Sequence, residues 1–200
     1  SVLVASTGVI GKQIPIDKIA AGVEMLKPQL AATREAAATA AQAIMTTDTE
    51  PKEVAVQIEI GGKTVTIGSM CKGSGMIHPN MATTLNFITS DVAISHEMIQ
   101  RALDEIVKIT YNCLSIDGDT STNDMVSVMA NGLAGNEEIC TTEDAGFAVF
   151  KQALYIVMMN MTRMLAKDGE GATKLLECTC KGAPDQETAI IVAKSVIRSP

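Results

Sequence analysis

Apolar side chains recur along the chain at two spacings, one typical of helices and the other typical of strands. Repeats at every third or fourth position predict helices over residues 15–28, 34–45 and 142–167. Two further helices are expected to begin after the capping residues Ser95 and Asp185. In the long helix, which Thr142 would cap, the residues expected to face inward are Phe147, Phe150, Leu154, Val157, Met161 and Leu165.

Alternation of apolar and polar residues predicts a strand that is half buried on one face and carries Val54, Val56, Ile58 and Ile60. The Gly61-Gly62 pair turns this strand into a second one, so the two form a hairpin. Shorter apolar runs predict strands over residues 2–5, 84–89, 113–116 and 175–180, and a buried segment at 125–129. Hairpins mixed with helices indicate a layered α/β fold with antiparallel pairing rather than a plain βαβ winding.

The composition excludes several classes of function. The 200 residues are 46% apolar and carry 16 basic against 23 acidic side chains, a formal charge of −7. No basic stretch relieves this charge and no apolar run is long enough for a membrane span, so we expect neither a nucleic-acid nor a membrane partner. No signal-peptide pattern follows Ser1, and the missing initiator Met is typical of a fragment or a processed chain.

The cysteines favour free structural thiols in a reducing compartment, because there are five of them at irregular spacings. Cys178 and Cys180 lack the further ligands that zinc would need, and we predict no metal site. The methionines between residues 158 and 164 are expected to fill the core.

Common catalytic and binding motifs fail on their spacing. The acidic run 117–124 begins like a calcium loop, but Thr122 stands where the loop needs glycine and Val128 where it needs glutamate. The glycines near Lys72 lack the phosphate-binding spacing, and neither His78 nor His96 has a nucleophile-elbow sequence nearby.

Three polar stretches are hard to explain by packing: residues 6–8, 72–83 and 117–124. Each alone is compatible with an ordinary loop. Together with further motifs they resemble the ornithine acetyltransferase (glutamate N-acetyltransferase) family of arginine biosynthesis. The resemblance is carried, in the family's order, by Ser6-Thr7-Gly8-Val9-Ile10-Gly11, Thr46-Thr47-Asp48-Thr49, Lys72-Gly73-Ser74-Gly75-Met76-Ile77, Pro79-Asn80-Met81-Ala82-Thr83, residues 117–124, and Asp168-Gly169-Glu170-Gly171-Ala172-Thr173-Lys174.

The resemblance implies an α/β fold of the DmpA/ArgJ-like type, a layered α/β/β/α sandwich with mixed and antiparallel strands. It also implies self-cleavage between Ala82 and Thr83. Residues 1–82 would then be the C-terminal part of an α subunit and residues 83–200 the N-terminal part of a β subunit. Both parts would contribute to one catalytic domain in an α2β2 assembly. The resemblance also implies a cytoplasmic location, or the mitochondrial matrix if the source is a fungus.

The implied chemistry uses Thr83 as a nucleophile. A threonine hydroxyl is weak until a base takes its proton, and the α-amino group that cleavage frees on the same residue can do so, since its pKa is about 8. Thr83 would take the acetyl group of N-acetylornithine, release ornithine, and pass the acetyl group to glutamate. The matching oxyanion-hole residues are Thr7 and Gly8, which would stabilise the transient negative charge.

The remaining motif matches are substrate-binding residues. Lys72 is suited to hold a substrate carboxylate, and Glu170 is suited to hold the ornithine ammonium group. One threonine of the Thr46-Thr47 pair also matches, and we prefer Thr46. Further binding groups belong to a C-terminal segment of the family that this sequence does not contain. Residues 117–124 are expected to form a self-hydrogen-bonded loop near the site.

The sequence departs from the family at Thr84, where methionine is usual, so the cleavage position is open by one residue. Thr83 is preferred because it follows Met-Ala at the expected distance from Lys72. The resemblance implies no cofactor and leaves open whether acetyl-CoA is also a co-substrate. Two other interpretations stay open: a hydrolase (an aminopeptidase or amidohydrolase) with an N-terminal threonine, and a non-catalytic fragment or assembly module.

Overall fold

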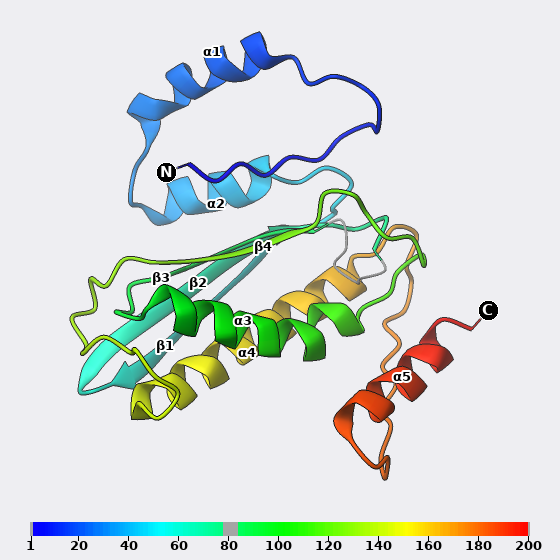
Figure 1. Cartoon of the computed structure of the whole chain (residues 1–200). Coiled ribbons are helices and arrows are strands. Elements are labelled where there is room, and N and C mark those ends of the chain that lie inside the picture. Colours follow the sequence, from blue (N-terminus) through cyan, green and yellow to red (C-terminus); the bar gives the residue numbers. More distant parts are fainter. Residues whose placement is uncertain (1, 78–83, 200) are drawn as a thin grey trace.

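The structure is a computed structural model that describes residues 2–77 and 84–199 (Figure 1). Along the described chain lie five α-helices, two short 3-10 helices and four strands. They are α1 (Ile16–Leu26), η1 (Lys27–Gln29), α2 (Arg34–Ala43), β1 (Lys52–Ile60), β2 (Lys63–Lys72), β3 (Leu85–Ser90), α3 (His96–Ile109), η2 (Tyr111–Cys113), β4 (Met125–Ala130), α4 (Ala145–Lys167) and α5 (Gln186–Ile197).

The strands form one mixed sheet in the order β1-β2-β3-β4. Strands β1, β2 and β3 pair antiparallel, whereas β4 joins β3 in parallel after the chain has passed through α3. The β1–β2 hairpin is confirmed, and both residues of its turn, Gly61 and Gly62, have positive φ angles of 58° and 72°. This is the backbone conformation that a tight hairpin turn requires and that glycine adopts without strain.

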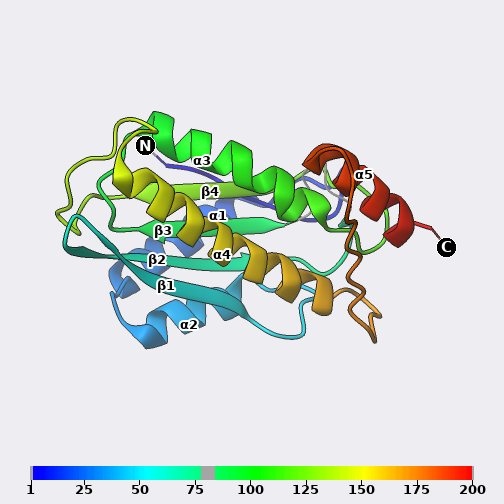
Figure 2. The same cartoon turned by 90° about the horizontal axis from the view of Figure 1, so that it is seen from below.

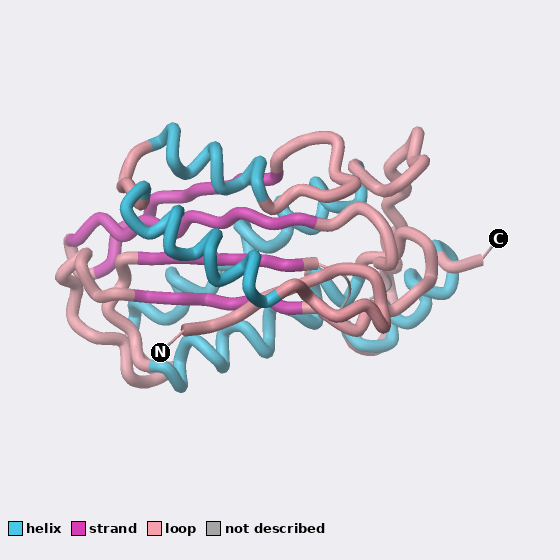
Figure 3. Tube along the Cα trace, turned by 90° about the horizontal axis from the view of Figure 1, so that it is seen from above, coloured by secondary structure: helices cyan, strands magenta, loops and turns pink. Residues whose placement is uncertain are grey.

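Helices lie on both faces of the sheet. Figure 2 shows α3 and α4 side by side across one face, and Figure 3 shows α1 and α2 over the opposite face. The α/β fold class with mixed and antiparallel strands is therefore confirmed. The described residues form one sheet, whereas the implied α/β/β/α sandwich has two sheet layers. None of the helices in the described part of the chain is long and apolar enough to cross a membrane.

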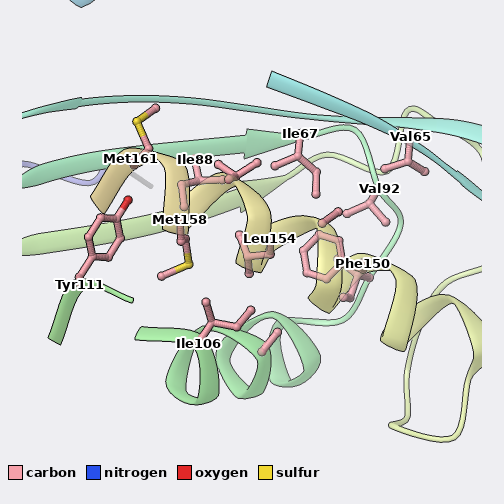
Figure 4. Close-up of a cluster of buried hydrophobic side chains, with 14 of the residues drawn as sticks. Val65, Ile67, Ile88, Val92, Ile106, Tyr111, Phe150, Leu154, Met158 and Met161 are labelled. Carbon is pink, nitrogen blue, oxygen red and sulfur yellow. The ribbon is translucent and has the colours of Figure 1, made fainter. Parts of the chain in front are cut away.

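The hydrophobic core lies between the sheet and the α3–α4 layer (Figure 4). Ser95 caps α3 by accepting a hydrogen bond from the Met98 amide, as predicted. The apolar stripe of α4 is confirmed as well: the six residues predicted to face inward are all buried, and so is Met158. The five cysteines are free thiols.

Three predicted strands do not form. Residues 2–5 have no strand partner, and Val2, Leu3 and Val4 are exposed. Of residues 113–116, Cys113 ends the 3-10 turn η2 and the other three pair with no described strand. Residues 175–180 form an unpaired, exposed segment apart from half-buried Cys180. An apolar run becomes a strand only where a neighbouring strand satisfies its backbone groups, and the sequence alone does not reveal that neighbour.

Other predictions need smaller corrections. Helix α4 begins at Ala145 after Asp144, not after Thr142, because the Asp144 carboxylate binds the amides of Cys140 and Thr141 and forms a turn there. Strand β4 is only half buried, with Met129 46% exposed. Helix α1 forms as predicted but buries none of its residues within the described chain.

Candidate active site

One end of the sheet collects the predicted binding residues. The strand registers pair Lys52 with Cys71, Lys72 with Leu85, and Leu85 with Met125. The beginnings of β1, β3 and β4 and the end of β2 therefore meet at the same edge. The segments that flank these strand ends in the sequence, including residues 46–49 and 117–124, are brought together there.

Lys72 is a buried cation at this edge. Its side chain is 5% exposed, and its Nζ donates a hydrogen bond of 2.7 Å to Thr46 Oγ1. The nearest carboxylate oxygen in the described chain is Asp48 Oδ2 at 4.0 Å. Lys72 is thus a buried ammonium group beside a threonine hydroxyl, and not a solvated loop charge.

The two threonines have different partners. Thr46 contacts Lys72, whereas the Thr47 hydroxyl shares a hydrogen bond of 2.5 Å with the hydroxyl of Ser74. The geometry favours Thr46 as the threonine that acts with Lys72, in agreement with the preferred assignment. Its role in binding substrate stays a prediction.

A buried ion network supports this edge and was missed by the sequence analysis. Lys52 is 1% exposed, and its Nζ lies 2.7 Å from Asp48 Oδ1 and 2.5 Å from Asp168 Oδ2. Asp48 also accepts hydrogen bonds from the amides of Gly73 at 2.7 Å and Thr46 at 3.1 Å. The Asp48 carboxylate therefore fixes the backbone at Gly73, next to Lys72, relative to the backbone at Thr46.

The ionisation of these groups follows from burial opposed by hydrogen bonds. Burial alone would raise the pKa of Asp48, but hydrogen bonds from Gly73, Lys52 and Thr46 lower it below its ordinary value. Burial would lower the pKa of Lys52, but its hydrogen bonds to Asp168 and Asp48 raise it. Burial also opposes ionisation of Asp168, whose pKa is lowered by Lys52 and Thr49. All three groups are charged near neutral pH.

The C-terminal end of α4 places Asp168 and Glu170. Asp168 follows the last turn of the helix and accepts a hydrogen bond of 3.0 Å from the Thr49 amide. Two residues later the Glu170 amide donates to the Ser74 carbonyl at 2.7 Å. The Glu170 carboxylate lies so close to Gly75 that a Cβ atom there would be 2.6 Å from it. Glu170 is thereby placed beside the segment that follows Lys72.

One sequence signal could have revealed the network. Lys52 has the same parity along β1 as the inward-facing Val54, Val56 and Ile58. A lysine on the buried face of a strand needs a buried carboxylate. The Thr46-Thr47-Asp48-Thr49 motif contained one such carboxylate, but nothing in the sequence indicated that the end of a helix 116 residues away supplies the other.

Residues 117–124 form the predicted self-hydrogen-bonded loop. The Asp119 amide donates to Asp117 Oδ1 at 3.1 Å, and the Asn123 amide donates to Ser121 Oγ at 3.1 Å. The loop also contacts the site edge, because Asp117 binds the Ile77 amide at 2.9 Å and Asp124 binds the Thr84 amide at 2.8 Å.

Other predicted site residues are not brought to this edge by any contact in the described chain. Ala82 and Thr83, the predicted cleavage pair, lie outside the described residues, as does His78. Thr7 is half buried and Gly8 is exposed, both in an irregular segment before α1. Their role as oxyanion donors stays a prediction. No group of three or more metal-ligating side chains occurs among the described residues.

Comparisons with known proteins match nearly the whole chain. The family model described as ArgJ family matches residues 1–200. The arginine biosynthesis bifunctional protein ArgJ of Bacillus subtilis is 49% identical over 199 residues, which cover 99% of this chain and 48% of that protein. The protein of the same name from Symbiobacterium thermophilum is 50% identical over 196 residues, covering 98% of this chain and 48% of that protein.

A solved structure shows the same fold. The crystal structure of the arginine biosynthesis bifunctional protein argJ from Bacillus halodurans matches with a TM-score of 0.54 and 46% identity. The match covers 56% of this chain and 52% of that chain. The chain thus spans about half the length of the curated relatives that it matches.

Proposed function

The chain belongs to the ArgJ family, and on that premise we propose that the whole protein is an acetyltransferase acting on amino acids. It moves the acetyl group of N2-acetylornithine to glutamate through an ester on Thr83. The name of the relatives, arginine biosynthesis bifunctional protein, supports a place in arginine biosynthesis. Whether acetyl-CoA is a second acetyl donor stays open. We propose no cofactor.

The reaction begins with self-cleavage. The Thr83 hydroxyl attacks the carbonyl carbon of Ala82, the C–N bond breaks, and the nitrogen leaves as an amine. Water then hydrolyses the resulting ester, which restores the hydroxyl and leaves a free α-amino group on Thr83. This amine takes the hydroxyl proton when Thr83 attacks the acetyl carbonyl, and ornithine leaves as the amine. The amine of glutamate then attacks the acetyl ester and restores Thr83.

The observation that carries the proposal is the arrangement at the sheet edge. The ammonium group of Lys72 is buried, and within the described chain it donates a hydrogen bond to one acceptor, Thr46. It therefore retains donors for a substrate carboxylate. An exposed carboxylate, Glu170, lies beside the segment that follows Lys72 and is suited to an ammonium group. An amino acid with an α-carboxylate and a side-chain ammonium group, such as N-acetylornithine, matches this pair of charges.

The surroundings of Thr84 support Thr83 over Thr84 as the nucleophile. Thr84 is 4% exposed, and its hydroxyl accepts a hydrogen bond of 2.7 Å from the Asn86 side chain. Its amide is bound to Asp124 at 2.8 Å and its carbonyl to the Met125 amide at 2.9 Å. A hydroxyl that is buried and already bound to Asn86 is less available to attack a substrate carbonyl, which favours Thr83 as the nucleophile.

The division of the chain follows from the same proposal. Residues 1–82 belong to the α piece and residues 83–200 to the β piece, and both contribute to one domain, assembled as α2β2. The ion network supports a domain built from both pieces, because Lys52 of the first piece binds both Asp48 of its own piece and Asp168 of the second.

A transfer assay on the complete gene product tests the function. We expect ornithine release beyond the first turnover to require glutamate in stoichiometric amounts, and all ornithine release to disappear in Thr83→Ala. Release of acetate at the same rate without glutamate would contradict acetyl transfer and would favour the hydrolase interpretation. Absence of any reaction in a folded, cleaved wild-type protein would contradict both.

A further inference from the structure

Two aspartates of the acidic loop bind backbone amides on both sides of residues 78–83. The carboxylate of Asp117 accepts hydrogen bonds from the amides of Met76 and Ile77, the latter at 2.9 Å. The carboxylate of Asp124 accepts one from the amide of Thr84 at 2.8 Å. The loop therefore contacts the last described residues before the predicted cleavage pair and the first described residue after it.

Backbone hydrogen bonds double each contact. The Ile116 amide donates to the Ile77 carbonyl at 2.7 Å, and the Met125 amide donates to the Thr84 carbonyl at 2.9 Å. The second of these continues the parallel register in which β3 and β4 pair Leu85 with Met125. Ile77 is fully buried in the core and Thr84 is 4% exposed, so both flanking residues are anchored to the rigid part of the fold.

This arrangement carries local costs. Met76 has a φ of 55°, the left-handed conformation that non-glycine residues rarely adopt. The second carboxylate oxygen of Asp124 is buried without a hydrogen-bond partner in the described chain. Burial raises the pKa of this carboxyl to about 6, although hydrogen bonds from Thr84 lower it. A strained residue and an under-bonded buried carboxylate at one place are features found where function outweighs local stability.

We propose that Asp117 and Asp124 are positioning residues for self-cleavage: their carboxylates fix Ile77 and Thr84, and so set the geometry in which the bond before Thr83 breaks. This inference rests on the proposed function, because it concerns the cleavage step. Neither aspartate takes part in the bonds that form or break. They act through the backbone amides that they hold, on the two sides of the segment that contains the cleavage pair.

The rate of self-cleavage in the complete gene product tests the proposal. Uncut precursor is purified early after induction, and conversion is followed by intact mass. We expect Asp117→Ala and Asp124→Ala to slow cleavage by about tenfold or more, since each loses charge-assisted hydrogen bonds. Asp119→Ala is the matched control: Asp119 is exposed in the same loop, and its carboxylate makes no hydrogen bond or ion pair with the described residues. We expect it to cleave at the wild-type rate.

Conservative variants separate positioning from charge. Asp124→Asn keeps an oxygen that can accept from the Thr84 amide, so we expect most of the wild-type rate. Asp117→Asn keeps one acceptor oxygen of the two that bind Met76 and Ile77, so its rate should fall between wild type and Asp117→Ala. Equal rates for the Asn and Ala variants at both positions would contradict the proposed contacts.

Hydrogen exchange supplies a readout that does not depend on cleavage. In the uncut Thr83→Ala background, Asp124→Ala should speed exchange of the Thr84 amide and Asp117→Ala that of Ile77, while Asp119→Ala changes neither. Suppose that the wild-type protein cuts itself and that the folded Asp117→Ala and Asp124→Ala variants cleave as fast as Asp119→Ala. The positioning role is then wrong, and the proposed function stands. If wild type never cuts itself, the proposed self-cleavage fails, and the positioning role fails with it.

Discussion

The Glu170 carboxylate lies against a position that has no side chain. A Cβ atom on Gly75 would be 2.6 Å from its carboxylate carbon and from one of its oxygens. The carboxylate is the end of a flexible, exposed side chain, so it would move rather than distort the fold. Gly75 therefore determines where the negative charge of Glu170 is available.

We accordingly expect Gly75→Ala to fold normally and to raise KM for N2-acetylornithine by about tenfold or more, because a displaced carboxylate loses its ionic hydrogen bond to the substrate ammonium group. The effect on kcat should be smaller. Gly68→Ala is the control, since its Cβ would meet only Thr89 Oγ1 at 3.9 Å. Steady-state kinetics of the complete protein measure both values. An unchanged KM in Gly75→Ala would contradict the proposed role of Glu170 in binding the substrate ammonium group.

The carboxyl group of Asp124 is expected to make the stability of the protein depend on pH. Its pKa is raised from 3.8 to about 6 in the folded protein, mainly by burial. Between these values the folded state binds more protons than the unfolded state, so this group lowers the free energy of unfolding as pH rises. Asp124→Asn removes the effect. We expect urea unfolding to show the variant gaining stability relative to wild type as pH rises through this window. A constant difference between the two proteins would contradict the raised pKa.

At the scale of single residues, the sequence indicated members of this edge only where a short motif contained them, and their roles stay predictions. Lys72, Thr46 and Glu170 were chosen from short motifs, and the structure brings all three to one edge. Lys52 was missed although its parity in β1 placed it on the buried face. The contacts of Asp117 and Asp124 with residues 41 and 40 positions away depend on strand register, which the sequence does not specify.

At the scale of elements, an ion pair joins strand β1 to the end of helix α4. Lys52 lies at the start of β1, and Asp168 follows the last turn of α4. The pair therefore fixes the helix end that carries the Asp168-Gly169-Glu170 segment over the sheet edge. A shift of α4 along its axis would move Glu170 away from Gly75.

We expect Lys52→Met to lower the free energy of unfolding by about 3–5 kcal/mol, because it leaves the buried carboxylate of Asp48 and the half-buried carboxylate of Asp168 without their cation. Glu105→Gln is the matched control. It removes the partner of Lys151 in an exposed ion pair, where both side chains are at least 39% exposed, and should cost less than about 1 kcal/mol. Urea unfolding monitored by circular dichroism measures both. Equal losses in the two variants would show that burial does not govern this pair.

Elements with a strong repeat were predicted well, and unpaired apolar runs were not. The stripe of α4 and the alternation of β1 follow from burial on one face, which the sequence records directly. Residues 2–5 and 175–180 have the composition of strands, but no strand among the described residues lies beside them to pair with. Whether such a neighbour exists is a property of the whole fold, so composition misleads at these places.

At the scale of the whole molecule, the sheet order explains how residues far apart in the chain form one site. The antiparallel hairpin brings Lys52 and Lys72 to the same end, and the parallel addition of β4 brings the acidic loop beside Thr84. In the sequence, the predicted cleavage pair falls between β2 and β3, and the last residue of β2 and the first residue of β3 both lie at this end of the sheet. Self-cleavage would therefore leave both new chains bound to one sheet.

Mass spectrometry of the complete protein tests the central claim, that Thr83 of a freed chain carries the acetyl group. The protein is incubated with N2-acetylornithine, first without and then with glutamate. We predict a chain beginning Thr83-Thr84-Leu85-Asn86 that gains one acetyl group on the Thr83 hydroxyl and loses it when glutamate is added. A chain uncut at Thr83, or one that is never acetylated while transfer proceeds, would contradict the account.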